Sequence, residues 1–179
     1  MSLKTSTGYS ALQITLHWGI AVLVFSQLLS GDSMTAALNA ALHHTAVTPA
    51  HARWAQAHYW LGIIILALAA VRLVIRVAVG APPALLETRW LQTATRISHA
   101  LFYVFLLATP VLGLLGYYLA QPLIDLHLIA KSALFVLIVL HICLALYHHF
   151  IRRDATLRRM WLPTRREHPN QQPGIDPSA

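Results

Sequence analysis

The chain has 179 residues, of which 57% are hydrophobic and only 11% are charged, and its formal net charge is +7. A soluble domain carries about 25% charged residues, so this composition excludes an ordinary soluble protein and favours a membrane protein. The single cysteine, Cys143, excludes an intrachain disulfide.

Apolar residues gather in four runs, each near the ~20 residues that a helix needs to cross a bilayer. The runs cover Leu12–Leu29, His58–Val79, Leu101–Leu119 and Leu126–Phe150. We therefore predict an all-α fold, a transmembrane four-helix bundle. Residues 1–161 are expected to form one membrane domain, and the polar, proline-rich residues 162–179 a disordered tail. The first run could be a signal peptide, but it is long for one and no small-residue cleavage site follows closely.

The connections follow from turn residues and polar stretches. Residues 30–56 are expected to form a loop, in which Met34–His44 could be a helix lying on the surface. The glycine and prolines of residues 80–83 end the second helix, because proline cannot continue it. Pro110 is expected to kink the third helix, and the glycines 113 and 116 to allow a neighbouring helix to approach closely.

Lysine and arginine are distributed unequally between the two sides of the predicted membrane domain. One side has Lys4, Arg72, Arg76, Arg89, Arg96, Arg152, Arg153, Arg158, Arg159, Arg165 and Arg166. The other side has only Arg53 and Lys131. The positive-inside rule then predicts a multi-pass protein of the bacterial inner membrane with both termini in the cytoplasm. The basic charge is explained by this topology, so no nucleic-acid partner is expected.

Four histidines lie within the apolar runs: His17, His58, His127 and His141. An imidazole in hydrocarbon is costly and marks a candidate functional site. His141 follows His127 by 14 residues, which places both on one helix face about 21 Å apart. Two histidines from different helices can bind one haem iron from both faces. The four residues are therefore enough for two haems b, held non-covalently because no c-type attachment motif is present.

The depth of each histidine predicts its partner. His58 and His127 begin their helices on the periplasmic side and are expected to bind one haem. His17 and His141 lie in the cytoplasmic half and are expected to bind the other. His148, on nearly the same face as His141, is an alternative fourth ligand. The simpler alternative is that these are buried histidines bonded only to neighbouring helices.

Other polar residues near these positions are candidate partners of the haems or of a quinone. Arg72 follows His58 by 14 residues and would either pair with haem propionates or extend to the interface. Lys131, one turn after His127, is a candidate for the other propionates. His99 and His148 could bond a propionate or a quinone carbonyl, or simply be solvated. The loop histidines 43, 44 and 51 do not match a recognised metal-ligand spacing.

Together these segments resemble the bacterial cytochrome b561 family, in the wider group that includes cytochrome b subunits of nickel–iron hydrogenases and formate dehydrogenase. The resemblance rests on Tyr9–Trp18, His58 with Gly62 and Arg72–Arg76, His99 with Pro110–Gly113, and His127–His141 continuing to Asp154. It implies a four-helix bundle with two b haems bound by histidines of the first, second and fourth helices, and electron transfer to or from a membrane quinone. In stand-alone members it implies superoxide oxidation coupled to ubiquinone reduction. The link between the third and fourth helices is short here, so recognition of the donor is expected to differ.

The leading hypothesis is therefore a di-haem electron carrier, a candidate superoxide:ubiquinone oxidoreductase with ubiquinone as its exchangeable substrate. A second possibility is an anchor subunit for a dehydrogenase or hydrogenase partner. A rival from another class is a transporter with a histidine relay. Only haem binding explains two histidines on one helix face with partners at matching depths.

Overall fold

The computed structural model describes residues 8–80, 89–153 and 157–163. The chain forms four long helices and a short 3-10 turn: α1 (Ala11–Leu42), α2 (Pro49–Val79), α3 (Arg89–Tyr118), α4 (Gln121–Phe150) and η1 (Arg158–Met160). The described residues contain no strand, and each of the four helices is long and apolar enough to cross a membrane. The prediction of an all-α fold with four long apolar helices is confirmed. Lys4 and nearly all of the predicted tail, residues 164–179, lie outside the described residues.

Local capping residues determine where the helices begin and end. The Ser10 hydroxyl accepts a hydrogen bond from the Gln13 backbone N–H at 3.3 Å, and the Gln13 side chain accepts one from the Ser10 N–H at 3.0 Å. This reciprocal pair satisfies two amides that the first turn leaves open. Thr48 caps α2 in front of Pro49, a residue well suited to the first helical position. Gly80 ends α2 with φ 81°, a conformation that favours glycine.

The predicted loop over residues 30–56 is wrong. Only residues 43–48 join α1 to α2, and the segment expected as a separate surface helix is the last part of α1. It is rich in alanine, the strongest helix former, so α1 continues beyond its most apolar part. The third helix likewise begins at Arg89 rather than Leu101. Apolar runs predict the membrane-embedded part of a helix, whereas propensity and caps determine its full length.

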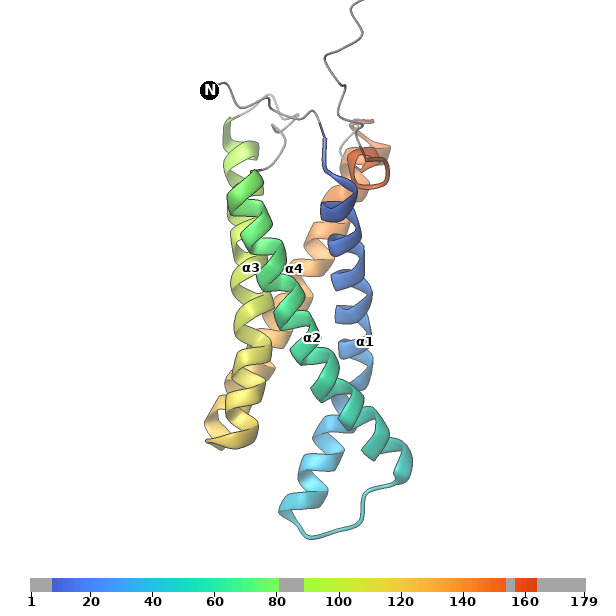
Figure 1. Cartoon of the computed structure of the whole chain (residues 1–179), viewed down its shortest axis with the longest axis vertical. Coiled ribbons are helices and arrows are strands. Elements are labelled where there is room, and N and C mark those ends of the chain that lie inside the picture. Colours follow the sequence, from blue (N-terminus) through green and yellow to red (C-terminus); the bar gives the residue numbers. More distant parts are fainter. Residues whose placement is uncertain (1–7, 81–88, 154–156, 164–179) are drawn as a thin grey trace, which may run out of the picture.

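The helices form an antiparallel bundle, in which α1 packs along α2, α3 along α4, and α2 against α3 (Figure 1). We call the end with the α1–α2 and α3–α4 connections the loop end, and the opposite end the terminal end. At the loop end, α1 and α2 extend beyond α3 and α4 (Figure 1). A Cβ added at Gly116 would lie 2.8 Å from the Ile124 backbone nitrogen, so the predicted close approach of a neighbouring helix is confirmed. α3 continues on both sides of Pro110.

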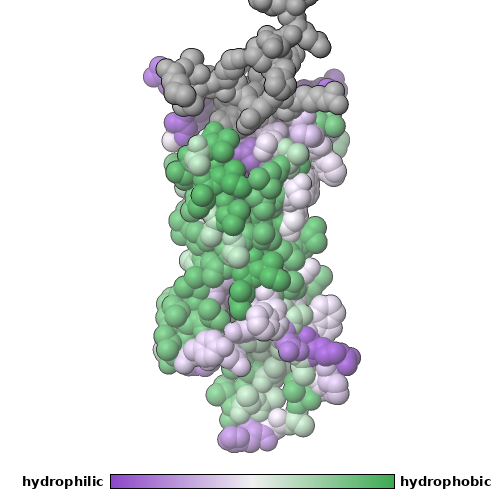
Figure 2. Space-filling view, viewed as in Figure 1, coloured by the Kyte–Doolittle hydropathy of each residue, from purple (hydrophilic) through white to green (hydrophobic). Residues whose placement is uncertain are grey.

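The buried core is small and lies midway along the bundle. Ile20, Val24 and Ile65 form it, with Leu23, Leu68, Leu106 and Ile138 packed around them. Many other large apolar side chains are exposed on the outside, among them Leu29, Val74 and Ile129. Figure 2 shows this apolar surface along the middle of the molecule and hydrophilic residues nearer its ends. An exposed apolar surface of this extent is typical of helices embedded in a membrane.

Candidate haem-binding sites

Two pairs of histidines face each other between different helices. His58 of α2 and His127 of α4 have ring centroids 6.3 Å apart, and so do His17 of α1 and His141 of α4. Two imidazoles bound to one metal ion at about 2.0–2.1 Å would have ring centres roughly 6 Å apart. The observed spacing therefore fits one ion between each pair. The structure brings together the same partners that depth along the helices predicted.

His127 is held at the loop end by α3. Its Nδ1 lies 2.8 Å from the Thr109 carbonyl oxygen, which can only accept, so Nδ1 carries the proton. Nε2 is then the nitrogen with a free lone pair, as a metal ligand requires. The ring lies so close to α3 that a Cβ at Gly113 would be 2.8 Å from Nδ1. Glycine at this position makes the approach of His127 possible.

His58 is held from α1 by two residues. The Ser30 hydroxyl lies 3.1 Å from His58 Nδ1 and 3.3 Å from the Gln27 carbonyl and side-chain oxygens. The Gln27 amide donates back to the His58 carbonyl at 2.8 Å. A Cβ at Gly62 would lie 3.0 Å from that amide nitrogen. Gly62 therefore makes room for the Gln27 side chain.

The loop-end pair lines a mostly apolar cavity. Gly62 and Gly113 contribute to its wall, and so does Lys131. The Thr109 hydroxyl, also in the wall, is buried and has no hydrogen-bond partner within the described ranges. Imidazoles, apolar walls, missing side chains and one ammonium group are what a haem with anionic propionates would contact. The residues present at this site therefore fit a haem.

At the terminal end, His99 and Arg72 gather near the second pair. The His99 ring centroid is 6.3 Å from that of His141, and its Nδ1 donates to the Thr95 carbonyl at 2.8 Å. Arg72, half-buried, donates to the Gln13 carbonyl at 3.2 Å and so connects α2 to the start of α1. Both predicted accessory residues therefore lie on the side of the bundle that holds His17 and His141.

The remaining predicted histidines differ in their placement. His148 is 5% exposed and its ring contacts that of Tyr147, while the ring that faces His17 is that of His141. His43, His44 and His51 are exposed at the α1–α2 connection. The described part of the chain contains no group of three or more histidine, cysteine or acidic side chains placed to hold a metal ion.

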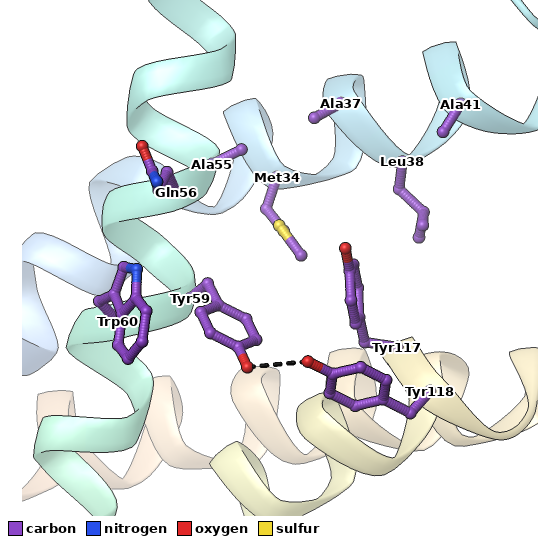
Figure 3. A pocket seen from close by; sticks show the side chains of 10 residues that line it. All are labelled: Met34, Ala37, Leu38, Ala41, Ala55, Gln56, Tyr59, Trp60, Tyr117 and Tyr118. Atoms are coloured by element: carbon purple, nitrogen blue, oxygen red, sulfur yellow. Dashed lines mark hydrogen bonds between the residues drawn. The ribbon is translucent and has the colours of Figure 1, made fainter.

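A second cavity, of about 420 Å³, lies at the loop end between the extended parts of α1 and α2 and the end of α3 (Figure 3). The Tyr59 and Tyr118 hydroxyls share one hydrogen bond, with their oxygens 3.0 Å apart (Figure 3). Met34, Leu38, Tyr59 and Tyr117 line this cavity and also the cavity of His58 and His127. The two spaces are therefore adjacent. Sequence reasoning did not find this cavity, because it depends on the unpredicted extension of α1 and α2.

Sequence reasoning also missed the residues that hold the histidines. Gln27 is a polar residue within an apolar run, and that alone was a usable signal. Ser30 and Thr109 gave no such signal, because small hydroxyl residues are common in membrane helices and usually bond backbone carbonyls of their own helix. Their roles depend on which residue of a neighbouring helix lies opposite.

Comparison with known proteins identifies the family. A family model for prokaryotic cytochrome b561 matches residues 8–163. Cytochrome b562 of Cereibacter sphaeroides is 32% identical over 164 residues, covering 87% of this chain and 96% of that protein. The probable superoxide oxidase CybB of Yersinia pestis is 26% identical over 181 residues, covering 88% and 97%. With its histidine pairs and four apolar helices, the chain belongs to the prokaryotic cytochrome b561 family, the electron-transport cytochromes that carry haem b in a membrane.

Proposed function

We propose that this protein is a di-haem membrane cytochrome that transfers electrons across the bacterial inner membrane between a periplasmic donor and quinone. One observation carries the proposal: two histidine pairs from different helices, each with ring centroids 6.3 Å apart, share α4. Their α4 members are 14 residues apart, about 21 Å along the helix. The pairs therefore lie at different depths of one membrane.

In this proposal His58 and His127 hold one haem, and His17 and His141 hold the other. Each haem would supply an iron that cycles between the ferric and ferrous states by one electron. With two imidazoles holding each iron, no position would be open, which favours electron transfer over oxygen chemistry. The apolar cluster around Ile20, Val24 and Ile65 lies between the pairs along the helices.

Orientation follows from basic residues. We place the terminal end in the cytoplasm, because the described segments there contain Arg72, Arg76, Arg96, Arg152, Arg153 and Arg158. The loop end then faces the periplasm, and both termini are cytoplasmic. Arg53 and Lys131 are the only lysines or arginines at that end among the described residues.

The proposed reaction is oxidation of superoxide and reduction of ubiquinone. Two superoxide ions each lose one electron to become dioxygen, and the two electrons with two protons convert one quinone to quinol. The printed name of the Yersinia pestis relative supports this donor. Lys131 lines the loop-end cavity and would attract an anion there. Arg72, His99 and His148, at the terminal end, are candidates to bond the quinone head group.

Stopped-flow spectroscopy of the purified protein tests this function. Superoxide should reduce the oxidised protein on the time scale of the stopped-flow measurement, and a ubiquinone analogue should reoxidise it. Superoxide dismutase added with the superoxide should abolish the reduction and is the control for the donor. If superoxide leaves the oxidised protein unchanged while quinol reduces it readily, the proposed direction is wrong and a partner dehydrogenase becomes the better donor.

A further inference from the structure

The two histidine pairs differ in how their outer ring nitrogens are bonded. At the loop end, His58 Nδ1 lies 3.1 Å from the Ser30 hydroxyl and His127 Nδ1 lies 2.8 Å from the Thr109 carbonyl. At the terminal end, neither His17 nor His141 has a hydrogen bond to another residue that the structure describes. Within the described ranges, acceptors on neighbouring helices therefore hold the loop-end pair and do not hold the terminal-end pair.

Ser30 is buried and contacts both Gln27 and His58. Its side chain is 1% exposed, and its oxygen lies 3.3 Å from two acceptors on Gln27, the carbonyl and the side-chain oxygen. If His58 binds iron through Nε2, its Nδ1 carries the proton and donates to the Ser30 oxygen, 3.1 Å away. The single hydroxyl proton of Ser30 is then left for the two Gln27 acceptors, each at 3.3 Å. The hydrogen bond from the Gln27 side-chain amide to the His58 carbonyl, at 2.8 Å, keeps the three residues in register.

A hydrogen bond of this kind changes the reduction potential of the metal ion that the ring binds. When Nδ1–H donates to an acceptor, electron density rises at Nε2 and the ring becomes a more basic ligand. A more basic ligand stabilises ferric iron more than ferrous iron, so the reduction potential falls. Each end also has a cationic side chain near its pair, Lys131 at the loop end and Arg72 at the terminal end. These charges act in the same direction at both sites, whereas the hydrogen bonds to the outer ring nitrogens are found at the loop end alone among the described residues.

We infer that Ser30, held by Gln27, is a positioning residue that orients His58 and lowers the potential of the iron bound by His58 and His127. That iron would then have a lower potential than the iron bound by His17 and His141. Electrons would run downhill from the loop end to the terminal end. The inference rests on the proposed di-haem function, but it derives the direction from hydrogen bonds within this chain.

A potentiometric titration of the purified full-length protein, followed by visible absorption, tests it. The wild type should show two one-electron waves. His17→Ala should abolish the wave of higher potential, which assigns the waves to the sites. Ser30→Ala should raise the midpoint potential of the lower wave alone. The expected rise is about 59 mV, which for one electron corresponds to a tenfold loss of preference for ferric iron. Ser30→Thr, which keeps the hydroxyl, should restore the wild-type value.

Ser26→Ala is the matched control, because Ser26 lies one turn earlier on α1 and donates to the Val22 carbonyl of its own helix. It should move neither wave. If Ser30→Ala does not retain two haems, Gln27→Leu should raise the same wave by a smaller amount. Two bound haems with unshifted waves in both variants, or a shift confined to the upper wave, would overturn this inference while leaving the proposed function intact. A wild-type protein without two haems would instead contradict the proposed function.

Discussion

Gly113→Ala is expected to damage the loop-end site through a single methyl group. The added Cβ would lie 2.8 Å from His127 Nδ1 and 3.0 Å from Cε1. Non-bonded heavy atoms prefer about 3.5–4.0 Å, so the ring must retreat by roughly 0.7 Å. That exceeds the ~0.5 Å within which a functional site must be held. It also stretches the 2.8 Å bond from His127 to the Thr109 carbonyl.

Loss of such an outer-shell partner typically weakens metal binding by about 10–100-fold, or roughly 1.4–2.7 kcal/mol. We therefore expect haem content to fall from about two per polypeptide toward one, measured by haem extraction from purified protein. Gly19→Ala is the matched control, because a Cβ there meets nothing within 4 Å. Alanine is the better helix former by about 1 kcal/mol, so a general loss of helix stability does not explain the effect. A Gly113→Ala protein with two haems and an unchanged spectrum would refute this reasoning.

Three further predictions concern ligands, topology and charge. His141→Ala should lose one haem and His148→Ala should keep both, measured by haem extraction; the opposite result would make His148 the ligand. With Cys143 replaced by serine, a cysteine at Ser2 should resist a membrane-impermeant maleimide in intact cells, and its labelling would contradict cytoplasmic termini. Lys131→Glu should slow reduction by superoxide several-fold at low salt and less at high salt, with Lys131→Gln between. Equal rates in the wild type and both variants would show that Lys131 does not attract superoxide to the site.

The lengths of the apolar runs and the positions of the histidines were sufficient to predict the four long apolar helices and which histidine rings face each other. Spacing on α4 places His127 and His141 on one face, and depth along the other helices then selects His58 and His17 as the residues opposite. These are properties of single helices in a bilayer of fixed thickness. For that reason they can be read before any contact between helices is known.

The parts that sequence reasoning missed depend on contacts between helices or on caps. The extension of α1 to Leu42 and of α2 back to Pro49 follows from alanine propensity and the Thr48 cap, which an apolar-run criterion ignores. Ser30 holds His58 only because α1 and α2 pack in one particular register. A one-residue change in that register would turn the hydroxyl away without altering any pattern in the sequence.

Haem stoichiometry with low-spin ligation tests the central claim most directly. The full-length protein, purified in detergent, should contain about two haems b per polypeptide and show the absorption and magnetic resonance signals of bis-histidine iron. His58→Ala and His17→Ala should each remove one haem and leave the other. A colourless protein, a ratio near one in the wild type, or loss of the same haem in both variants would contradict the account.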